Sequence, residues 1–388
     1  MLTLIKNAQV YAPEYLGDKE ILICGEKILA IEESIDIRSE YLKVIDASNK
    51  IAVPGFVDSL VHITGGGGEG GYCSRTPEVN LTDLTLAGIT TLVAALGTDS
   101  ISRTLTGLLA KAKELNEYGL SCYIYSGSYH LPVKTLTSEL QSDLMLIEEC
   151  IGVGEVAISD HRSSQPSFRQ LAALAADARV GGMLSGKGGV VSIHMGPGNS
   201  MFNPLYEVVN KTDIPIQQFY PTHINRNQAL LDAGIEYTRC GGYIDLTTSS
   251  NSMSFSTGEI KCSKALKYYI EQGGDLSKIT FSSDGHASLP EFNDKGELVS
   301  LEVGSERSLF NEVRDAVLQE NVPFEEALPT ITKTPADILK LTKKGRLNVG
   351  LDADINLLDK TDLMIDTVIS LGQIMVENGM PVVKGRFE

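Results

Sequence analysis

The sequence lacks any long apolar run. No uninterrupted stretch approaches the ~20 apolar residues that a membrane-spanning helix needs, so we expect no membrane span and no membrane partner. The first twenty residues, MLTLIKNAQVYAPEYLGDKE, soon become polar and lack the apolar core of a secretory signal. Both absences favour a protein that remains in the cytoplasm.

Positive charge is also scarce. Lysine and arginine total 33 against 50 aspartates and glutamates, which gives a formal net charge of −17. Nucleic acids and anionic membrane surfaces both require a basic face. The balance therefore argues against either as a main partner, although it permits a locally positive pocket for an anionic substrate.

Closely spaced cysteines are missing as well. The chain has no CxxC motif, and its six cysteines lie far apart, which predicts reduced thiols in a cytoplasmic protein and not a disulfide framework. They are Cys24, Cys73, Cys122, Cys150, Cys240 and Cys262.

Three regions of the chain differ in their pattern of apolar residues and turns. Residues 1–53 and 339–388 read as short strands separated by turns, whereas residues 54–338 alternate apolar runs with helical patterns. Because the two ends resemble each other, we predict one small β-sandwich domain built from both termini, with a large domain inserted between them.

The central region predicts a (β/α)8 barrel of the TIM type. Apolar runs spaced by roughly 30 residues, with helical stretches between them, are typical of parallel strands joined by helices. The strand candidates are 55–62, 90–96, 121–127, 154–159, 189–195, 216–223, 241–247 and 278–284, and the helical candidates include 79–88, 104–119, 138–152, 168–182 and 263–274. A doubly wound open sheet is the alternative, but no GxGxxG follows the first strand, which disfavours a dinucleotide site.

Metal-ligating side chains gather at the ends of these runs, where a barrel builds its active site. Three of the six histidines, His62, His194 and His223, lie at or near the ends of strand candidates, and Asp284 ends the eighth. Glu155 lies at the start of the fourth run, so it needs either a different strand boundary or a side chain that reaches across the barrel to join them. Together these donors suit zinc or another divalent ion, although a single histidine at a strand end is more often a hydrogen-bonded structural residue.

Two further features suggest a substrate pocket. The glycine run 65–68 lacks a following GK[ST], so a phosphate cradle is the weaker interpretation. We expect instead a loop whose backbone approaches a ligand closely, with Glu69 at its rim. Arg162 and Arg226 each follow a strand candidate and could grip a carboxylate with two hydrogen bonds.

The chain resembles the isoaspartyl (β-aspartyl) dipeptidases of the amidohydrolase superfamily over essentially its whole length. The motifs that carry the resemblance are ITGGGGEGG (63–71), SRTPEV (74–79), GTDSISR (97–103), ISDHRS (158–163), IHMG (193–196), PTHINRN (221–227) and SSDGHAS (282–288). The resemblance implies a metal-dependent barrel hydrolase that acts on β-aspartyl dipeptides and assembles into a homo-oligomer.

The resemblance also implies metal and catalytic roles. His62 would be one of two histidines on the first strand, and His194 and His223 would hold the second metal. Asp284 would bind metal and act as the base, and Tyr129 would polarise the scissile carbonyl.

Substrate-binding roles follow in the same way. Glu69 would bind the free α-amino group of the dipeptide, and Arg162 and Arg226 would bind carboxylate. Thr98 and Ser288 would assist them.

Two positions depart from the family pattern. Glu155 takes the place of a carboxylated lysine that bridges the two metals, and a carboxylate can bridge equally well. Leu60 takes the place of the first histidine of the HxH pair, and a leucine offers no lone pair. Since ligand number governs affinity, we expect Glu155, His194 and His223 to keep their ion. The site of His62 and Asp284 should then be weak or empty, leaving one or two zinc ions per chain.

The sequence leaves other functions open. Leu60 alone would suit a catalytically silent relative that binds a dipeptide or amino acid, or serves only within an oligomer. A hydrolase of cyclic amides or N-acyl amino acids is a further alternative, although Glu69 and the two arginines favour a zwitterionic dipeptide. Leu60 could also have been introduced deliberately.

Overall fold

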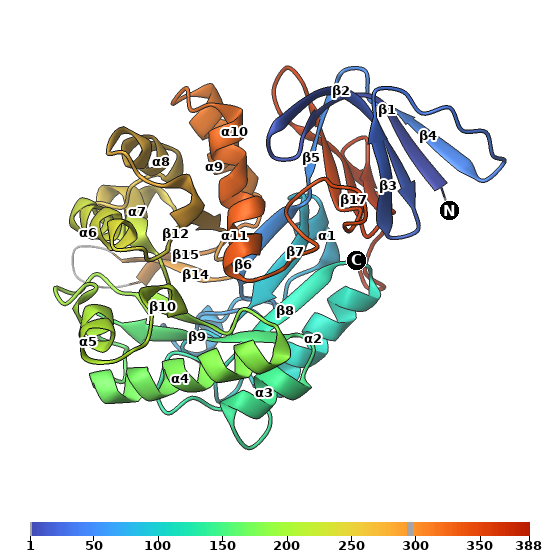
Figure 1. The fold of residues 1–388 in the computed structure, drawn as a ribbon. Coiled ribbons are helices and arrows are strands. Elements are labelled where there is room, and N and C mark those ends of the chain that lie inside the picture. The colour runs from blue at the N-terminus through green and yellow to red at the C-terminus, as the bar shows by residue number, and fades with distance from the viewer. Residues whose placement is uncertain (1, 293–297) are drawn as a thin grey trace.

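The computed structural model describes residues 2–292 and 298–388. It contains a barrel of strands surrounded by helices and, beside it, a separate sheet that contains both chain ends (Figure 1). None of the helices in these two ranges is long and apolar enough to cross a membrane.

Eight parallel strands form the barrel, and each overlaps one strand predicted from the sequence. They are β6 (Phe56–Val61), β7 (Ile89–Ala94), β8 (Ser121–Ser126), β9 (Cys150–Ile158), β10 (Val190–Met195), β11 (Phe219–Thr222), β12 (Ile244–Thr247) and β13 (Ile279–Ser282). Strands β6 to β11 pair in sequence order, β12 pairs with β13, and a parallel bridge between Val61 and Gly285 joins the end of β13 to β6. The predicted (β/α)8 fold is confirmed.

Burial explains why these strands read as continuous apolar runs. Every residue of β6, β7, β9 and β10 is buried, since helices cover the outer face of a parallel barrel and side chains fill its interior. The strands therefore show little of the alternation that is typical of a sheet with one solvent-exposed face.

Helices cover the outside of the barrel. They are α1 (Leu81–Thr85), α2 (Leu105–Glu117), α3 (Leu140–Leu146), α4 (Phe168–Ser185), α5 (Asn203–Lys211), α6 (Gln228–Arg239), α7 (Ser252–Ser256), α8 (Cys262–Glu271), α9 (Ser308–Leu318), α10 (Phe324–Ala327) and α11 (Lys333–Ile338). Helix α4 shows how the sequence fixes such an element. Ser167 and Gln170 form a capping box at its start, and Gly186 ends it in the left-handed conformation that glycine adopts readily.

The two chain ends form one nine-stranded sheet, which confirms a β domain built from both termini. Its strands are β1 (Leu2–Tyr11), β2 (Tyr15–Cys24), β3 (Lys27–Glu32), β4 (Leu42–Asp46), β5 (Lys50–Pro54), β16 (Ile355–Asp359), β17 (Ile365–Ser370), β18 (Gln373–Glu377) and β19 (Met380–Pro381). Antiparallel pairing of β5 with β16 joins the N-terminal strands to the C-terminal ones, and the sheet has an apolar core of its own. We propose 1–53 and 339–388 as the extent of this domain.

The sequence analysis missed one hairpin. Strands β14 (Ser288–Phe292) and β15 (Leu298–Val303) pair antiparallel directly after the loop that follows β13. This hairpin lies beside the carboxyl ends of the barrel strands, where the candidate site is found.

Candidate active site

A cavity of about 500 Å³ opens at the carboxyl ends of the barrel strands. All site residues predicted from the sequence line it except Glu155, which is buried deeper: His62, Glu69, Thr98, Tyr129, Arg162, His194, His223, Arg226, Asp284 and Ser288. Residues at the ends of seven of the eight barrel strands, or in the loops that follow them, therefore meet in one space, as the barrel prediction requires.

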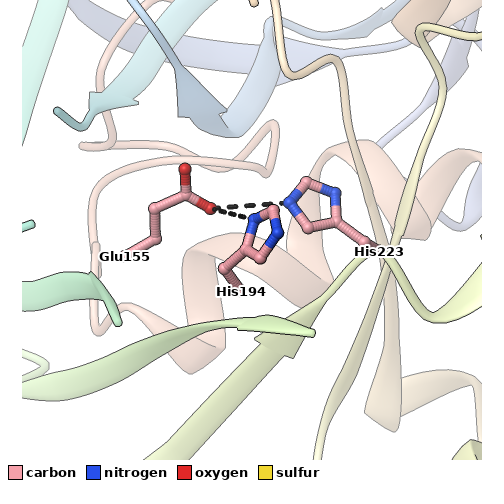
Figure 2. A group of neighbouring side chains, drawn as sticks. All are labelled: Glu155, His194 and His223. Carbon is pink, nitrogen blue, oxygen red and sulfur yellow. Dashed lines mark hydrogen bonds and ion pairs between the residues drawn. The ribbon is translucent and has the colours of Figure 1, made fainter. Parts of the chain in front are cut away.

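Glu155, His194 and His223 form a compact group of metal-ligating atoms. One potential ligand atom from each residue lies within 4.8 Å of the other two. Glu155 Oε2 is 3.2 Å from His194 Nδ1 and 3.5 Å from His223 Nε2 (Figure 2). All three side chains are buried.

A β-bulge brings Glu155 into this group. Strand β9 begins at Cys150, earlier than the predicted residue 154, so Glu155 lies within the strand and not at its start. The helix predicted for 138–152 correspondingly ends too late, because the chain becomes extended at Ile147. Gly154 and Glu155 together face the single residue Ser192 of β10, and such a bulge redirects a side chain. A Cβ at Gly154 would lie 2.5 Å from Ser192 O, so this close approach requires glycine.

The protonation of the group fits a divalent cation. Burial, together with nearby His194 and Arg226, lowers the pKa of His223 to about 4. Burial alone would raise the pKa of Glu155, but its contacts with His194 and His223 hold it well below the usual value. His223 Nδ1 lies 2.5 Å from the Thr247 hydroxyl, and within the described ranges its buried Nε2 has no hydrogen-bond partner. A neutral imidazole with a free nitrogen beside an ionised carboxylate is a ready donor set.

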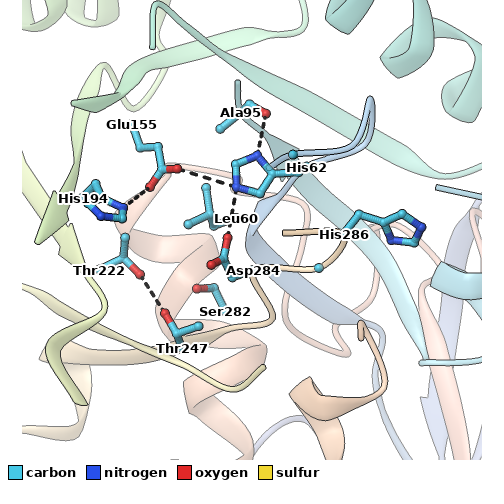
Figure 3. Close-up of polar contacts among 12 residues, drawn as sticks. Leu60, His62, Ala95, Glu155, His194, Thr222, Thr247, Ser282, Asp284 and His286 are labelled. Carbon is cyan, nitrogen blue, oxygen red and sulfur yellow. Dashed lines mark hydrogen bonds and ion pairs between the residues drawn. The ribbon is translucent and has the colours of Figure 1, made fainter. Parts of the chain in front are cut away.

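His62 and Asp284 form a second group next to the first, and Figure 3 draws Leu60 beside the contact between His62 and Glu155. His62 Nε2 lies 3.1 Å from Asp284 Oδ1 and 3.6 Å from Glu155 Oε1, and its Nδ1 lies 3.2 Å from the Ala95 carbonyl. Burial opposes the charged imidazole, but Asp284 and Glu155 raise the pKa of His62 to about 9. Leu60 is 2% exposed and packs in the apolar interior of the barrel, so it supplies bulk and no ligand.

The predicted substrate residues Glu69, Thr98 and Arg162 contact one another. Glu69 Oε1 accepts a hydrogen bond from the Thr98 hydroxyl at 3.0 Å and lies 3.2 Å from Arg162 Nη1. Arg226 Nη2 approaches the same region, 3.4 Å from His194 Nε2. Ser288 reaches the cavity beside the glycine loop, where a Cβ at Gly67 would lie 2.6 Å from Ser288 Cβ. The structure thus brings the acid, both arginines and the two hydroxyls to one cavity.

Arg103 fixes the loop that carries Glu69. Its guanidinium donates to the carbonyls of Thr64, Gly66 and Thr76, the last two at 3.1 and 2.9 Å. Hydrogen bonds to several backbone carbonyls therefore fix the glycine-rich loop, as expected for a segment whose backbone comes close to a ligand.

Tyr129 is placed as a hydrogen-bond donor. Its hydroxyl lies 2.8 Å from His194 Nδ1, and Arg162 lies over its ring, 5.4 Å from the ring centroid. Burial and then the charge of Glu155 raise the pKa of Tyr129 well above its usual value. The phenol consequently keeps its proton.

Asp160 is a site residue that the sequence analysis missed. Burial alone would raise the pKa of Asp160. Its contacts with His194 and Arg162 instead hold that pKa well below the usual range. Its carboxylate accepts from Arg162 Nε at 3.0 Å and Nη2 at 2.8 Å, and Oδ2 lies 3.2 Å from His194 Nε2. Asp160 thus orients both an arginine and a histidine of the site. The available signal was the acid two residues before Arg162 in the ISDHRS motif.

The comparisons with known proteins agree with this arrangement. The profile of the amidohydrolase family matches residues 230–375. A crystal structure of a β-aspartyl dipeptidase from the thermophilic keratin degrader Fervidobacterium islandicum AW-1, in complex with a β-Asp-Leu dipeptide, is 41% identical to the chain. The match covers 100% of both chains with a TM-score of 0.92. The chain belongs to the β-aspartyl dipeptidase family.

The chain is also similar, at lower identity or over a shorter segment, to proteins with other names. A dihydroorotase from Staphylococcus epidermidis is 43% identical over 68 residues, a segment that covers 18% of this chain and only 16% of that protein. A deacetylase from Agrobacterium fabrum is 22% identical over 389 residues, which cover 96% of this chain and 86% of that protein. Amidohydrolases generally depend on divalent metals, and the group of Glu155, His194 and His223 supplies a possible site for one.

Proposed function

We propose that the protein is a metal-dependent dipeptidase that hydrolyses β-aspartyl dipeptides. The observation that carries the proposal is the shared cavity. A carboxylate for an ammonium group, two arginines for carboxylates, a buried phenol and a set of metal-ligating side chains all line it or lie directly beneath it. A dipeptide with a free amino group and two carboxylates presents the complementary groups.

Zinc is the proposed metal, because buried imidazoles and a carboxylate are its usual ligands. Glu155, His194 and His223 would hold one ion tightly, and His62 with Asp284 would hold a second only weakly because residue 60 is a leucine. When bound, such an ion supplies Lewis acidity, which lowers the pKa of water and polarises an amide carbonyl.

The side chains of the site perform the remaining steps. Asp284, which lies 3.1 Å from His62 Nε2, accepts the proton of the attacking water and delivers it to the departing nitrogen. Tyr129 donates its hydroxyl proton toward the scissile carbonyl oxygen, where negative charge develops.

The substrate is held by charge complementarity. Glu69, assisted by Thr98, binds the free α-ammonium group, and Arg162 and Arg226 bind carboxylate with the help of Ser288. Asp160 positions Arg162 for this role, because its carboxylate accepts hydrogen bonds from two of the guanidinium nitrogens.

A second copy of the chain is the proposed partner. The cytoplasm is the proposed compartment, consistent with six cysteines that are all free.

Turnover tests the proposal directly. Zinc-loaded protein should cleave β-Asp-Leu and leave α-Asp-Leu, whose amide lies at the wrong carbon, essentially intact. Asp284→Asn should lower kcat by about 10²- to 10⁴-fold, the usual contribution of a general base, whereas Asp36→Asn, at an exposed residue of the small β domain, should not change it.

Two outcomes would contradict the proposal. No cleavage of β-Asp-Leu at any zinc concentration would favour a catalytically silent relative. Faster turnover of cyclic amides or N-acyl amino acids would favour the other hydrolase class.

A further inference from the structure

One part of the cavity has no role in the proposed chemistry. Ser254, Thr257 and Glu259, which follow β12 in the sequence, line it there. Strand β12 lies beside β11 and β13. The carboxylate of Glu69 instead contacts Thr98 and Arg162, which follow β7 and β9, on the other side of the barrel. Glu69 and Glu259 therefore lie at different walls of the same cavity.

Glu259 is fixed in position by its neighbours. Its backbone N–H donates to the carbonyl of Ser254 at 3.0 Å, and the Ser250 hydroxyl donates to its carboxylate. The next residue, Ile260, is bonded twice to Asn225, through its N–H at 2.8 Å and its carbonyl at 3.0 Å. These hydrogen bonds fix the backbone on both sides of Glu259, so its carboxylate keeps its place beside the loop that carries Arg226.

The charge of Glu259 is not balanced by an ion pair in the described ranges of the chain. The side chain is half-buried, and burial raises the pKa of Glu259 while the Ser250 hydroxyl and the more distant Arg226 lower it. A partly desolvated carboxylate without a cationic partner is stabilised when a ligand supplies one.

We propose that Glu259 is a specificity-determining residue that binds a cationic side chain on the residue released from the dipeptide. This inference rests on the proposed function. In a β-aspartyl dipeptide the nitrogen of the released residue forms the scissile amide, and the only free α-ammonium group goes to Glu69. A cation that reaches Glu259 must therefore come from a side chain, so lysine and arginine are the preferred released residues.

Two dipeptides with the same carbon skeleton test this assignment. β-Asp-Lys and β-Asp-norleucine differ only in the terminal ammonium group. We expect wild-type protein to favour β-Asp-Lys by roughly 3- to 10-fold in kcat/KM and in affinity measured by calorimetry, as for a partly exposed ion pair. Added salt should reduce the preference, since screening weakens such pairs.

Variants separate charge from folding. Glu259→Gln should abolish the preference while leaving turnover of β-Asp-norleucine unchanged, and Glu259→Lys should shift it toward β-Asp-Glu. The control Glu271→Gln removes an exposed acid of α8 and should preserve the preference.

The outcomes distinguish this inference from the proposed function. Turnover of both dipeptides at equal efficiency, unchanged in Glu259→Gln, overturns the inference alone. Charge-dependent binding without turnover supports it and overturns the proposed function. Absence of both binding and turnover overturns both.

Discussion

At residue 60 a leucine lies beside the two groups of potential metal ligands (Figure 3). It is buried in the apolar interior of the barrel, and its backbone carbonyl accepts from the N–H of Asp284 at 3.1 Å. Position 60 is therefore tied to the second group by its backbone, although its side chain contributes no ligand. Restoring a ligand there should change metal content without rebuilding the site.

Leu60→His should raise the bound zinc from about one ion per chain toward two, because a third donor joins His62 and Asp284. Without metal the variant should be less stable by about 1–3 kcal/mol, the cost of burying an unpaired polar group, and zinc should restore that loss. Elemental analysis after gel filtration gives the metal content, and urea denaturation with and without zinc gives the stability. Unchanged zinc content would count against the role assigned to this position.

Among individual residues, the sequence predicted those that occur in recognisable motifs at strand ends. Glu259 was missed because nothing in its local sequence marks it. Asp160 lies in the ISDHRS motif, but the motif does not show what its side chain contacts. Asp160 matters through contacts with Arg162 and His194, and Glu259 through a cavity wall that only the folded chain creates.

At the scale of elements, Asp58 links the first and last strands of the barrel. From within β6 it accepts hydrogen bonds from the backbone N–H groups of Leu60 at 3.3 Å and Ser283 at 3.0 Å. Its other oxygen has no hydrogen-bond partner among the described residues. Burial, partly offset by Ser283, raises the pKa of Asp58 to about 8.

This burial makes stability depend on pH. An unfolded aspartate has a pKa of about 3.9, so the folded state holds the proton more tightly. Its contribution to stability is therefore full below about pH 4 and is lost as pH rises toward 8. Asp58→Asn removes this titration, so the Tm of the variant minus that of the wild type should increase steadily from pH 5 to pH 8. A difference that is constant over this range would show that Asp58 does not titrate as described.

The sequence predicted the existence of the eight strands better than their limits. Apolar runs of β-branched residues identify a buried strand, but the bulge at Gly154 and Glu155 depends on the pairing with Ser192. The start of β9 at Cys150 was missed because 138–152 continues a helical pattern that tertiary pairing interrupts. The β14–β15 hairpin went unpredicted because it stands outside the strand–helix repeat of the barrel: in the described ranges its two strands form a sheet of their own.

For the whole molecule, a buried charge cluster joins the N-terminal and C-terminal parts of the small β domain. Lys344 Nζ lies 2.7 Å from Asp354 Oδ2 and 2.9 Å from Asp352 Oδ2, and its side chain is 4% exposed. Asp352 also pairs with Lys27 of β3. The cluster thus holds the segment before β16 against β3.

Lys344→Met should destabilise the protein by about 3–5 kcal/mol, because it leaves the buried carboxylate of Asp354 without its cation. Urea denaturation measures this loss, and Lys340→Met, at an exposed lysine nearby, serves as the control. Equal stability of the two variants would show that the cluster does not hold the two parts of the β domain together.

The central claim is that Glu155, His194 and His223 hold the one ion that supports hydrolysis of β-aspartyl dipeptides. Titrating zinc into metal-free protein while following cleavage of β-Asp-Leu tests it most directly. Activity should rise linearly with added zinc and level off at one zinc per chain. In Glu155→Gln the titration curve should lose this break at one equivalent. A break at two zinc ions per chain, or no activity at any zinc concentration, would contradict the claim.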